Sequence, residues 1–407
     1  MASQELFSEI DRQKNAMVQT LMDLIRIPAI APENGGEGEF KKAEKLIGTL
    51  KTLGLDEIKR YDAKDQRVPS GTRPNIVAYY GEEADEKLWI VTHLDIVPPG
   101  EESLWTLTKP FEPTIKDERI YGRGSEDNMQ SMIASIFAVR ALKDLGIEPK
   151  RTVALAFVAD EEQGSEFGIQ HLIKEGLFKP KDLIIVPDSG NGDGGFIEIA
   201  EKSALWFRLR TIGKQAHASR PATGLNAHRI GMQFALELDK LLHEKYSEKD
   251  EYFDPPETTI EPTKKDANVE AINIVPGEDV IYFDLRILPR YSVEEVIDDV
   301  NKLAREYESK TGASIRFEPV QKTVAPKPTD ADARIVKMLS EAIRNVRRIA
   351  PRVGGIGGGT CAAYFRRMGL PAVVWSTIDE VAHQPNEYAK IDNLVNDAKV
   401  YALVAMM

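Results

Sequence analysis

The sequence predicts an α/β protein in which a catalytic domain, a mixed sheet with helices on both faces, is interrupted by an inserted ferredoxin-like α+β domain. Three observations predict this architecture. Strand and helix patterns alternate over residues 1–200 and again over 321–407, as in α/β layers. Over residues 201–320 the pattern changes to βαββαβ, the order of a ferredoxin-like unit. The length of 407 residues also favours two domains, because single cores stop growing at roughly 250–300 residues.

The first part of the catalytic domain shows both periodicities. Apolar residues recur at helical spacing in the segments 5–26, 38–53, 129–145 and 168–175. Strands are expected at 75–80, 88–92, 152–159 and 183–186. The segment 152–159 is a continuous apolar run, as expected for a strand buried inside a parallel sheet.

The inserted domain and the return to the catalytic domain follow. Strands are expected at 203–212, 273–275, 280–287 and 314–318, and helices at 226–244 and 293–311. The charged segment 246–268 contains prolines and reads as a loop. In the last part, helices are expected at 331–346 and 386–405, with a strand at 371–376 between them.

The composition limits the partners and the compartment. The formal net charge of −12 argues against nucleic acid or an anionic membrane as a partner. Cys361 is the single cysteine, so no internal disulfide can form, which fits a reducing compartment. No signal peptide is apparent, and no apolar run reaches the ~18 residues of a membrane span. We therefore expect a cytoplasmic protein.

Acidic residues and histidines follow the expected strands. His93 comes directly after the strand 88–92, and Asp95 is placed to hold its second ring nitrogen. Loops at the carboxyl ends of strands are where open α/β sheets place their sites. Asp127 precedes the helix 129–145, and the local sequence by itself favours an N-cap aspartate over a site residue. Taken alone, the His-x-Asp sequence is a weak signal and is more typical of a polar loop.

A run of three carboxylates follows the apolar strand 152–159. These are Asp160, Glu161 and Glu162. Carboxylates crowded at the end of a buried strand repel one another unless cations or hydrogen bonds balance them. The run therefore favours a metal site over the alternative, a solvated acidic loop.

Asp188 and His383 complete the set, because each follows another expected strand. The order of groups along the chain is then His, Asp, Glu-Glu, Asp, His, and such donors suit zinc or a similar ion. If one glutamate acts as a base, five ligands remain. An odd number with a central aspartate suggests two ions that share one carboxylate.

Together these motifs resemble the metallopeptidase and deacylase family that includes glutamate carboxypeptidase, aminoacylase, acetylornithine deacetylase and succinyl-diaminopimelate desuccinylase. The resemblance covers about residues 5–405. It implies two Zn²⁺ per chain, with Co²⁺ or Mn²⁺ as substitutes, and five ligands: His93 and Asp188 for one ion, Glu162 and His383 for the other, and Asp127 as the bridge. Glu161 would be the general base and Asp95 the support for His93. The resemblance also implies a cis peptide bond between Asp127 and Asn128.

The resemblance further marks four substrate-binding residues. They are His217 in the segment 213–219, Asn273 in 272–276, Arg286 in 284–286 and Gly359 in the glycine turn 357–360. His217 would reach the active site of a neighbouring subunit, which makes the inserted domain a dimerisation and lid domain and the protein a homodimer. The other three would hold a substrate carboxylate, although a surface ion pair is the alternative for Arg286.

The expected activity is hydrolysis of an amide bond next to a free carboxylate. The resemblance favours deacylation of N-acyl amino acids, of the acetylornithine deacetylase or succinyl-diaminopimelate desuccinylase type. A carboxypeptidase or dipeptidase is the alternative within the family, and a catalytically silent protein that binds metal or amino-acid derivatives is the alternative class. Met129 and Cys361 stand where family members often carry lysine and aspartate, so the preferred substrate stays open.

Overall fold

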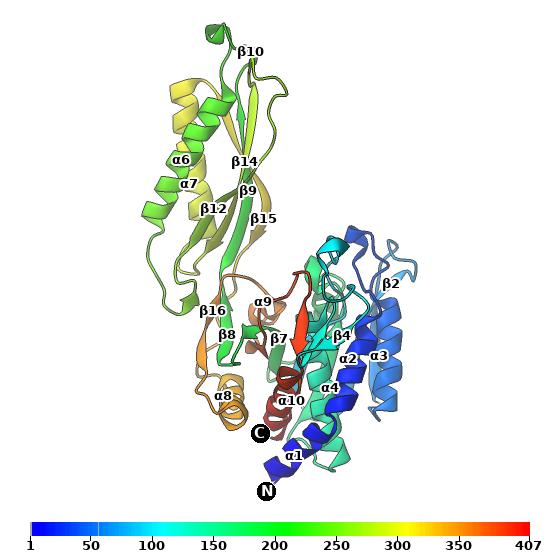
Figure 1. Cartoon of the computed structure of the whole chain (residues 1–407). Coiled ribbons are helices and arrows are strands. Elements are labelled where there is room, and N and C mark those ends of the chain that lie inside the picture. Colours follow the sequence, from blue (N-terminus) through cyan, green and yellow to red (C-terminus); the bar gives the residue numbers. More distant parts are fainter. Residues whose placement is uncertain (1, 56) are drawn as a thin grey trace. The chain divides into compact units, whose positions relative to one another are not determined.

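The computed structural model describes residues 2–55 and 57–407, and the chain forms two compact units (Figure 1). The first comprises residues 1–199, 328–353 and 360–407, and the second comprises residues 200–327 and 354–359. The expected insertion, 201–320, lies within the second unit. The short segment 354–359, which we expected in the catalytic domain, belongs to the second unit as well.

The first unit contains most of the helices and the larger sheet. Its helices are α1 (Ala2–Arg12), α2 (Lys14–Ile25), α3 (Phe40–Thr52), α4 (Gln130–Asp144), α5 (Ile169–Lys174), α8 (Arg334–Arg347), α9 (Ala362–Arg367) and α10 (Ile391–Met406). Its strands are β1 (Ile58–Lys64), β2 (Thr72–Tyr80), β3 (Lys87–His93), β4 (Thr114–Lys116), β5 (Arg119–Tyr121), β6 (Thr152–Val158), β7 (Leu183–Asn191), β17 (Ala372–Thr377) and β18 (Tyr388–Lys390). Two further strands, β8 (Phe196–Glu201) and β16 (Arg352–Ile356), extend across the boundary between the units.

The main sheet of the first unit is mixed, with the order β1-β2-β6-β3-β7-β17-β8. Its central strands β6, β3, β7 and β17 are parallel, whereas β1, β2 and β8 run antiparallel to their neighbours. Parallel neighbours place their carboxyl ends at the same edge of the sheet, so the loops that follow these strands converge there.

Helices cover this sheet on both faces. On one face, Trp89 of β3 lies in a buried apolar cluster with Leu172 of α5 and Phe365 of α9. Leu88 and Ile90 point to the opposite face, because side chains alternate along a strand, and they are buried too. The long apolar helix α4 contacts β3 and β6, and α10 packs alongside α4 (Figure 1). Cys361 is a small buried residue in the same apolar cluster as Trp89 and Phe365.

The helices differ from the sequence pattern at the N-terminus. The segment 5–26 forms two helices instead of one, because Gln13 forms a turn between α1 and α2. Gln13 is buried, and its amide donates to Glu9 and to Asp144 at the end of α4. The break therefore ties the two N-terminal helices to the core helix.

The second unit has the element order β9 (Ser203–Ile212), α6 (Ala227–Lys245), β12 (Thr259–Lys265), β14 (Glu278–Ile287), α7 (Val293–Thr311) and β15 (Ser314–Thr323). The sheet order is β12-β14-β9-β15, with all pairs antiparallel. Alternate residues of β9 (Leu205, Phe207, Leu209) face a core to which α6 and α7 contribute. This is the βαββαβ unit expected from the sequence.

One strand of this unit was assigned wrongly from the sequence. In chain order, the second strand of the four-stranded sheet is β12. It lies inside the segment 246–268 that we expected to be a loop. The expected strand 273–275 corresponds to β13 (Ile274–Val275). This strand pairs with β10 (Ala216–His217) and is not part of the four-stranded sheet. A further short strand, β11 (Phe253–Asp254), pairs with β16.

Among residues 2–55 and 57–407, no helix combines the length and the apolar character that crossing a membrane requires.

Candidate metal centre

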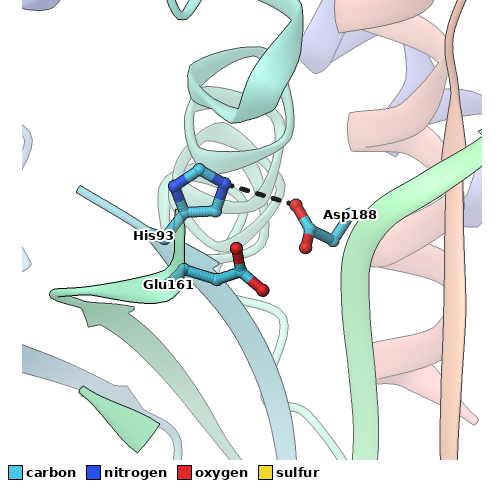
Figure 2. A group of neighbouring side chains, drawn as sticks. All are labelled: His93, Glu161 and Asp188. Atoms are coloured by element: carbon cyan, nitrogen blue, oxygen red, sulfur yellow. Dashed lines mark ion pairs between the residues drawn. The ribbon is translucent and has the colours of Figure 1, made fainter. Parts of the chain in front are cut away.

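Three of the expected site residues converge at the carboxyl edge of the main sheet (Figure 2). His93 is the last residue of β3, Glu161 begins a single helical turn just after β6, and Asp188 lies in the second half of β7. Because β3 pairs in parallel with both β6 and β7, the three side chains lie together. Ligand atoms of the three residues fall within 4.8 Å of one another.

The imidazole of His93 contacts two carboxylates through one ring nitrogen. His93 Nε2 lies 2.8 Å from Asp127 Oδ1 and 3.3 Å from Asp188 Oδ1. Asp127 comes from the loop before α4, where its backbone and that of Asn128 leave helical geometry. The Asp127–Asn128 peptide bond is cis, as the resemblance implied.

The second carboxylate oxygen of Asp127 faces the other expected histidine. His383 Nε2 lies 3.0 Å from Asp127 Oδ2 and 3.2 Å from Glu162 Oε1. His383 follows β17, with φ of +63° and a side chain that is 54% exposed. One aspartate thus stands between two imidazoles and offers one oxygen to each.

Asp95 supports this cluster in two ways. His93 Nδ1 lies 3.0 Å from the Asp95 backbone carbonyl and 3.7 Å from its carboxylate, so the carbonyl is the nearer hydrogen-bond partner. The carboxylate instead accepts the backbone N–H groups of Glu161 and Glu162, both at 3.0 Å. Asp95 therefore orients the imidazole with its main chain and holds the acidic turn with its side chain.

Asn128 is a functional residue that we did not expect from the sequence. Its Oδ1 accepts the backbone N–H of His93 at 3.1 Å, and its Nδ2 donates to Asp188 Oδ1 at 3.0 Å. One buried amide thus joins two candidate ligands that come from different strands. Its place beside Asp127 was the only signal in the sequence.

The carboxylates of the cluster lie so close together that a nearby positive charge would stabilise their ionised forms. Burial, and next the negative charge of Asp188, raise the pKa of Glu161 well above its ordinary value. Burial also raises the pKa of Glu162 to about 7, against the hydrogen bond from His383. Hydrogen bonds with Asp127 and Glu162 raise the pKa of His383 to about 10. Crowded carboxylates and imidazoles are the donors that divalent zinc-like ions prefer, so the residues fit such ions.

The four expected substrate-binding residues lie in the second unit. His217 and Asn273 are close to each other, because β10 pairs with β13 and the Ala218 N–H donates to the Asn273 carbonyl at 2.8 Å. His217, Asn273 and Gly359 are all exposed. His217 Nδ1 accepts the Ser219 N–H at 3.1 Å, so a neutral ring carries its proton on Nε2.

Arg286 is already paired within its own strand. Its Nε and Nη2 donate to Asp284 at 2.8 and 3.1 Å, and its guanidinium lies 5.3 Å from the centre of the Trp206 ring. This is the ion pair named above as the alternative explanation. Asp284 takes two of the donor directions, so a substrate carboxylate would use the remaining N–H groups of Nη1 and Nη2.

Comparison with known proteins identifies the family of the chain. Residues 89–407 match peptidase family M20/M25/M40. The chain belongs to this family. It is similar to an uncharacterized metallohydrolase of Methanocaldococcus jannaschii, with 42% identity over 93% of this chain and 96% of that protein. It is also similar to succinyl-diaminopimelate desuccinylase of Wolinella succinogenes, with 26% identity over 92% of this chain and 94% of that enzyme.

Among solved structures, the fold is similar to that of human carnosine dipeptidase 1. The TM-score is 0.76 with 17% identity, and the match covers 100% of this chain and 98% of that one. This likeness bears on the fold alone. Together with the family match, it confirms the resemblance inferred from the motifs and the mixed α/β architecture.

The role of Asp95 can be tested by substitution. Asp95→Ala leaves the N–H groups of Glu161 and Glu162 without their acceptor, so metal affinity, measured by calorimetry, is expected to fall about 10–100-fold. Asp182→Ala is the matched control, because Asp182 is also buried and accepts the backbone N–H of Lys87 at the opposite end of the strands. It should lower stability and leave metal affinity unchanged. Equal losses of metal affinity in both variants would contradict the role assigned to Asp95 in the metal centre.

Proposed function

We propose that this protein is a two-ion metallohydrolase that cleaves an amide bond next to a free carboxylate. The observation that carries the proposal is the position of Asp127, which offers Oδ1 to His93 and Oδ2 to His383. In this assignment His93 and Asp188 would hold one Zn²⁺, and Glu162 and His383 would hold the other. Co²⁺ or Mn²⁺ would be able to replace zinc, because the same donors bind them.

The acid–base work falls to Glu161. When bound, two such ions polarise the scissile carbonyl and lower the pKa of the attacking water. Glu161 takes the proton of that water and later gives it to the leaving amine. Its carboxylate lies within 4.8 Å of His93 and Asp188, and its backbone is fixed by Asp95. The structure therefore supports a base that is held beside the ions.

Substrate recognition is assigned to the second unit. Arg286, Asn273 and the backbone of Gly359 would hold the substrate carboxylate, since charge-assisted hydrogen bonds suit such a group. His217 would donate its Nε2–H to the developing oxyanion. The tautomer set by Ser219 supports this role, because it leaves a donor at the exposed nitrogen.

The relatives support a choice of substrate class. We favour deacylation of N-acyl amino acids, because the desuccinylase of Wolinella succinogenes resembles this chain over most of both lengths. A carboxypeptidase or dipeptidase of the same peptidase family is the second candidate. A catalytically silent binding protein is the alternative class. The retained Glu161, placed beside the candidate ligands, favours the enzyme.

The proposal extends to assembly and compartment. The second unit would form a homodimer through its ferredoxin-like sheet, since an exposed edge strand invites pairing with another chain. The edge strand β12 is largely exposed. We place the protein in the cytoplasm, as expected for a chain whose single cysteine is buried.

Metal content gives the first test. Metal-free protein loaded with Zn²⁺ is expected to bind two ions per chain, because the ligands form two sets that share Asp127. Elemental analysis after dialysis measures the ratio. Activity should disappear on chelation and return only as the second equivalent is added. Full activity at a stable maximum of one ion would contradict the two-ion assignment.

The substrate class is tested by a hydrolysis screen of acetyl-, succinyl- and aminoacyl-amino acids with added Zn²⁺ or Co²⁺. Turnover of the acyl compounds is expected, and turnover of aminoacyl compounds alone would favour the dipeptidase. Absence of any metal-dependent hydrolysis, with two ions bound, would favour the silent binding protein.

A further inference from the structure

Two buried glutamates beside the candidate ligands have no part in the chemistry proposed above. Glu126 precedes the bridging Asp127, and Glu387 lies four residues after His383. Their exposed fractions are 4% and 0%. Burying carboxylates carries a large cost unless hydrogen bonds satisfy them, so their partners indicate what they do.

Glu126 reaches from the Asp127 loop to the His383 loop. Its Oε1 accepts the backbone N–H of Asp379 at 2.6 Å, and its Oε2 accepts those of Val381 and Ala382 at 2.6 and 3.0 Å. The residue next to Ala382 is His383. One side chain therefore holds three amides of the segment that leads into the candidate ligand.

Glu387 makes the opposite connection. Its Oε1 accepts the N–H groups of Glu126 and Asp127 at 3.0 and 3.1 Å. Its Oε2 accepts the N–H of Gly124 at 3.0 Å and Nη1 of Arg123 at 2.6 Å. A carboxylate from the His383 loop thus holds the backbone of the bridging aspartate itself.

The local backbone explains why the His383 loop needs such support. Glu380, His383 and Asn386 have φ of +60°, +63° and +60°, in the left-handed region that residues other than glycine seldom occupy. Such conformations persist only where the surroundings hold them. His93 and Asp188, in contrast, lie on strands of the sheet and are joined by Asn128.

We propose that Glu126 and Glu387 form a reciprocal clamp, each binding backbone amides of the other's loop, that positions Asp127 and His383 and so sets the affinity of the ion assigned to Asp127, Glu162 and His383. Both glutamates act as positioning residues. This inference rests on the two-ion function proposed above. Both ions share Asp127, but only one of them uses His383. Weakening the Glu126 half of the clamp, which holds the amides that lead into His383, should therefore weaken the ion assigned to Glu162 and His383 more than the ion assigned to His93 and Asp188.

The test is calorimetric titration of metal-free protein with Zn²⁺. Glu126→Gln keeps the size of the side chain but places an NH₂ group against N–H donors. One of two binding steps is expected to weaken about 10–100-fold, the usual cost of losing a group that orients a ligand. It should be the same step that His383→Ala removes. Amides 381 and 382 should also exchange hydrogen faster in the metal-free variant than in the parent protein.

Two further variants separate the clamp from charge and from general damage. Glu126→Asp keeps the charge and shortens the side chain by one methylene. It should show the same selective loss of Zn²⁺ affinity in one binding step. It also takes the place of Glu126→Gln if that variant does not fold. Glu198→Gln is the matched control, because Glu198 is fully buried in β8 and accepts Nη1 of Arg366 at 2.8 Å. It should leave both binding steps unchanged.

The outcomes distinguish the clamp from the function on which it rests. Equal weakening of both steps, or unchanged binding in Glu126→Gln and Glu126→Asp, would overturn the clamp. A single binding step in the parent protein would instead overturn the two-ion function. In that case unchanged exchange at amides 381 and 382 in the variants would overturn the clamp as well, and faster exchange would support its structural part.

Discussion

Glu161→Gln is expected to lower kcat by about 10²–10⁴-fold while the protein keeps both metal ions, because glutamine cannot accept the proton of the attacking water. Glutamine has nearly the shape of glutamate, so the turn held by Asp95 should stay in place. Steady-state kinetics and elemental analysis of the same preparation measure the two quantities. A kcat near that of the parent protein would show that Glu161 is not the base.

The neighbouring carboxylate provides the matched control. Glu162→Gln changes the adjacent residue of the same turn, which contacts His383 at 3.2 Å and is assigned as a ligand. This variant should lose metal affinity together with activity. If Glu161→Gln instead loses a metal ion, Glu161 is a ligand, as its distance from His93 and Asp188 also permits.

His217→Ala is expected to lower kcat by about 10²–10³-fold, the usual cost of removing a donor to an oxyanion. If His217 serves the partner's active site, mixing this variant with Glu161→Gln should restore activity. In a mixed dimer, one site combines an intact Glu161 with an intact His217 from the other subunit. At statistical exchange about half the dimers are mixed, each with one good site of two, so about a quarter of the parent activity should return.

Co-refolding followed by activity measurement tests this expectation, and a tag on one variant reports the fraction of mixed dimers. His243→Ala, which changes an exposed histidine of α6 outside the assigned site, is the control and should be active without mixing. No recovery in preparations shown to contain mixed dimers would place His217 in its own subunit's site or outside catalysis. A monomer at all concentrations would contradict the shared site directly.

Much of the fold could be predicted because its strands and helices have clear patterns. β6 is buried along its whole length and reads as a continuous apolar run, whereas β9 alternates buried and partly exposed residues. β12 escaped prediction because five of its seven residues are exposed and it contains Pro262, so it lacks the alternation of a half-buried strand. Its place at the sheet edge tolerates that composition.

The gathering of the candidate site residues at one edge of the sheet could be predicted for a related reason. Loops that follow parallel strands converge whatever their sequence, so His93, Glu161 and Asp188 were expected together before any geometry was known. The groups that orient them could not be predicted. Glu126 and Glu387 bind backbone N–H groups, which every residue except proline carries, so their partners leave no pattern in the sequence.

The same limit applies to Asp95. Its neighbour His93 suggested a carboxylate–imidazole contact, but the nearer contact is made by the main-chain carbonyl. A carbonyl is common to all residues, so the sequence could not show which group of Asp95 faces the ring. The turn at Glu161 and Glu162, which the carboxylate holds instead, depends on three-dimensional proximity alone.

The central claim is that this metal centre hydrolyses an amide beside a free carboxylate. The most direct measurement compares kcat/KM for N-acetyl- and N-succinyl-amino acids with that for the same compounds whose carboxylate is converted to a methylamide, with and without Zn²⁺. We expect metal-dependent turnover of the free acids and a loss of about 10–100-fold for each methylamide, since a hydrogen bond to a charged group contributes about 1.5–3 kcal/mol. Equal kcat/KM for acid and methylamide, or no metal-dependent turnover of either, would contradict the account.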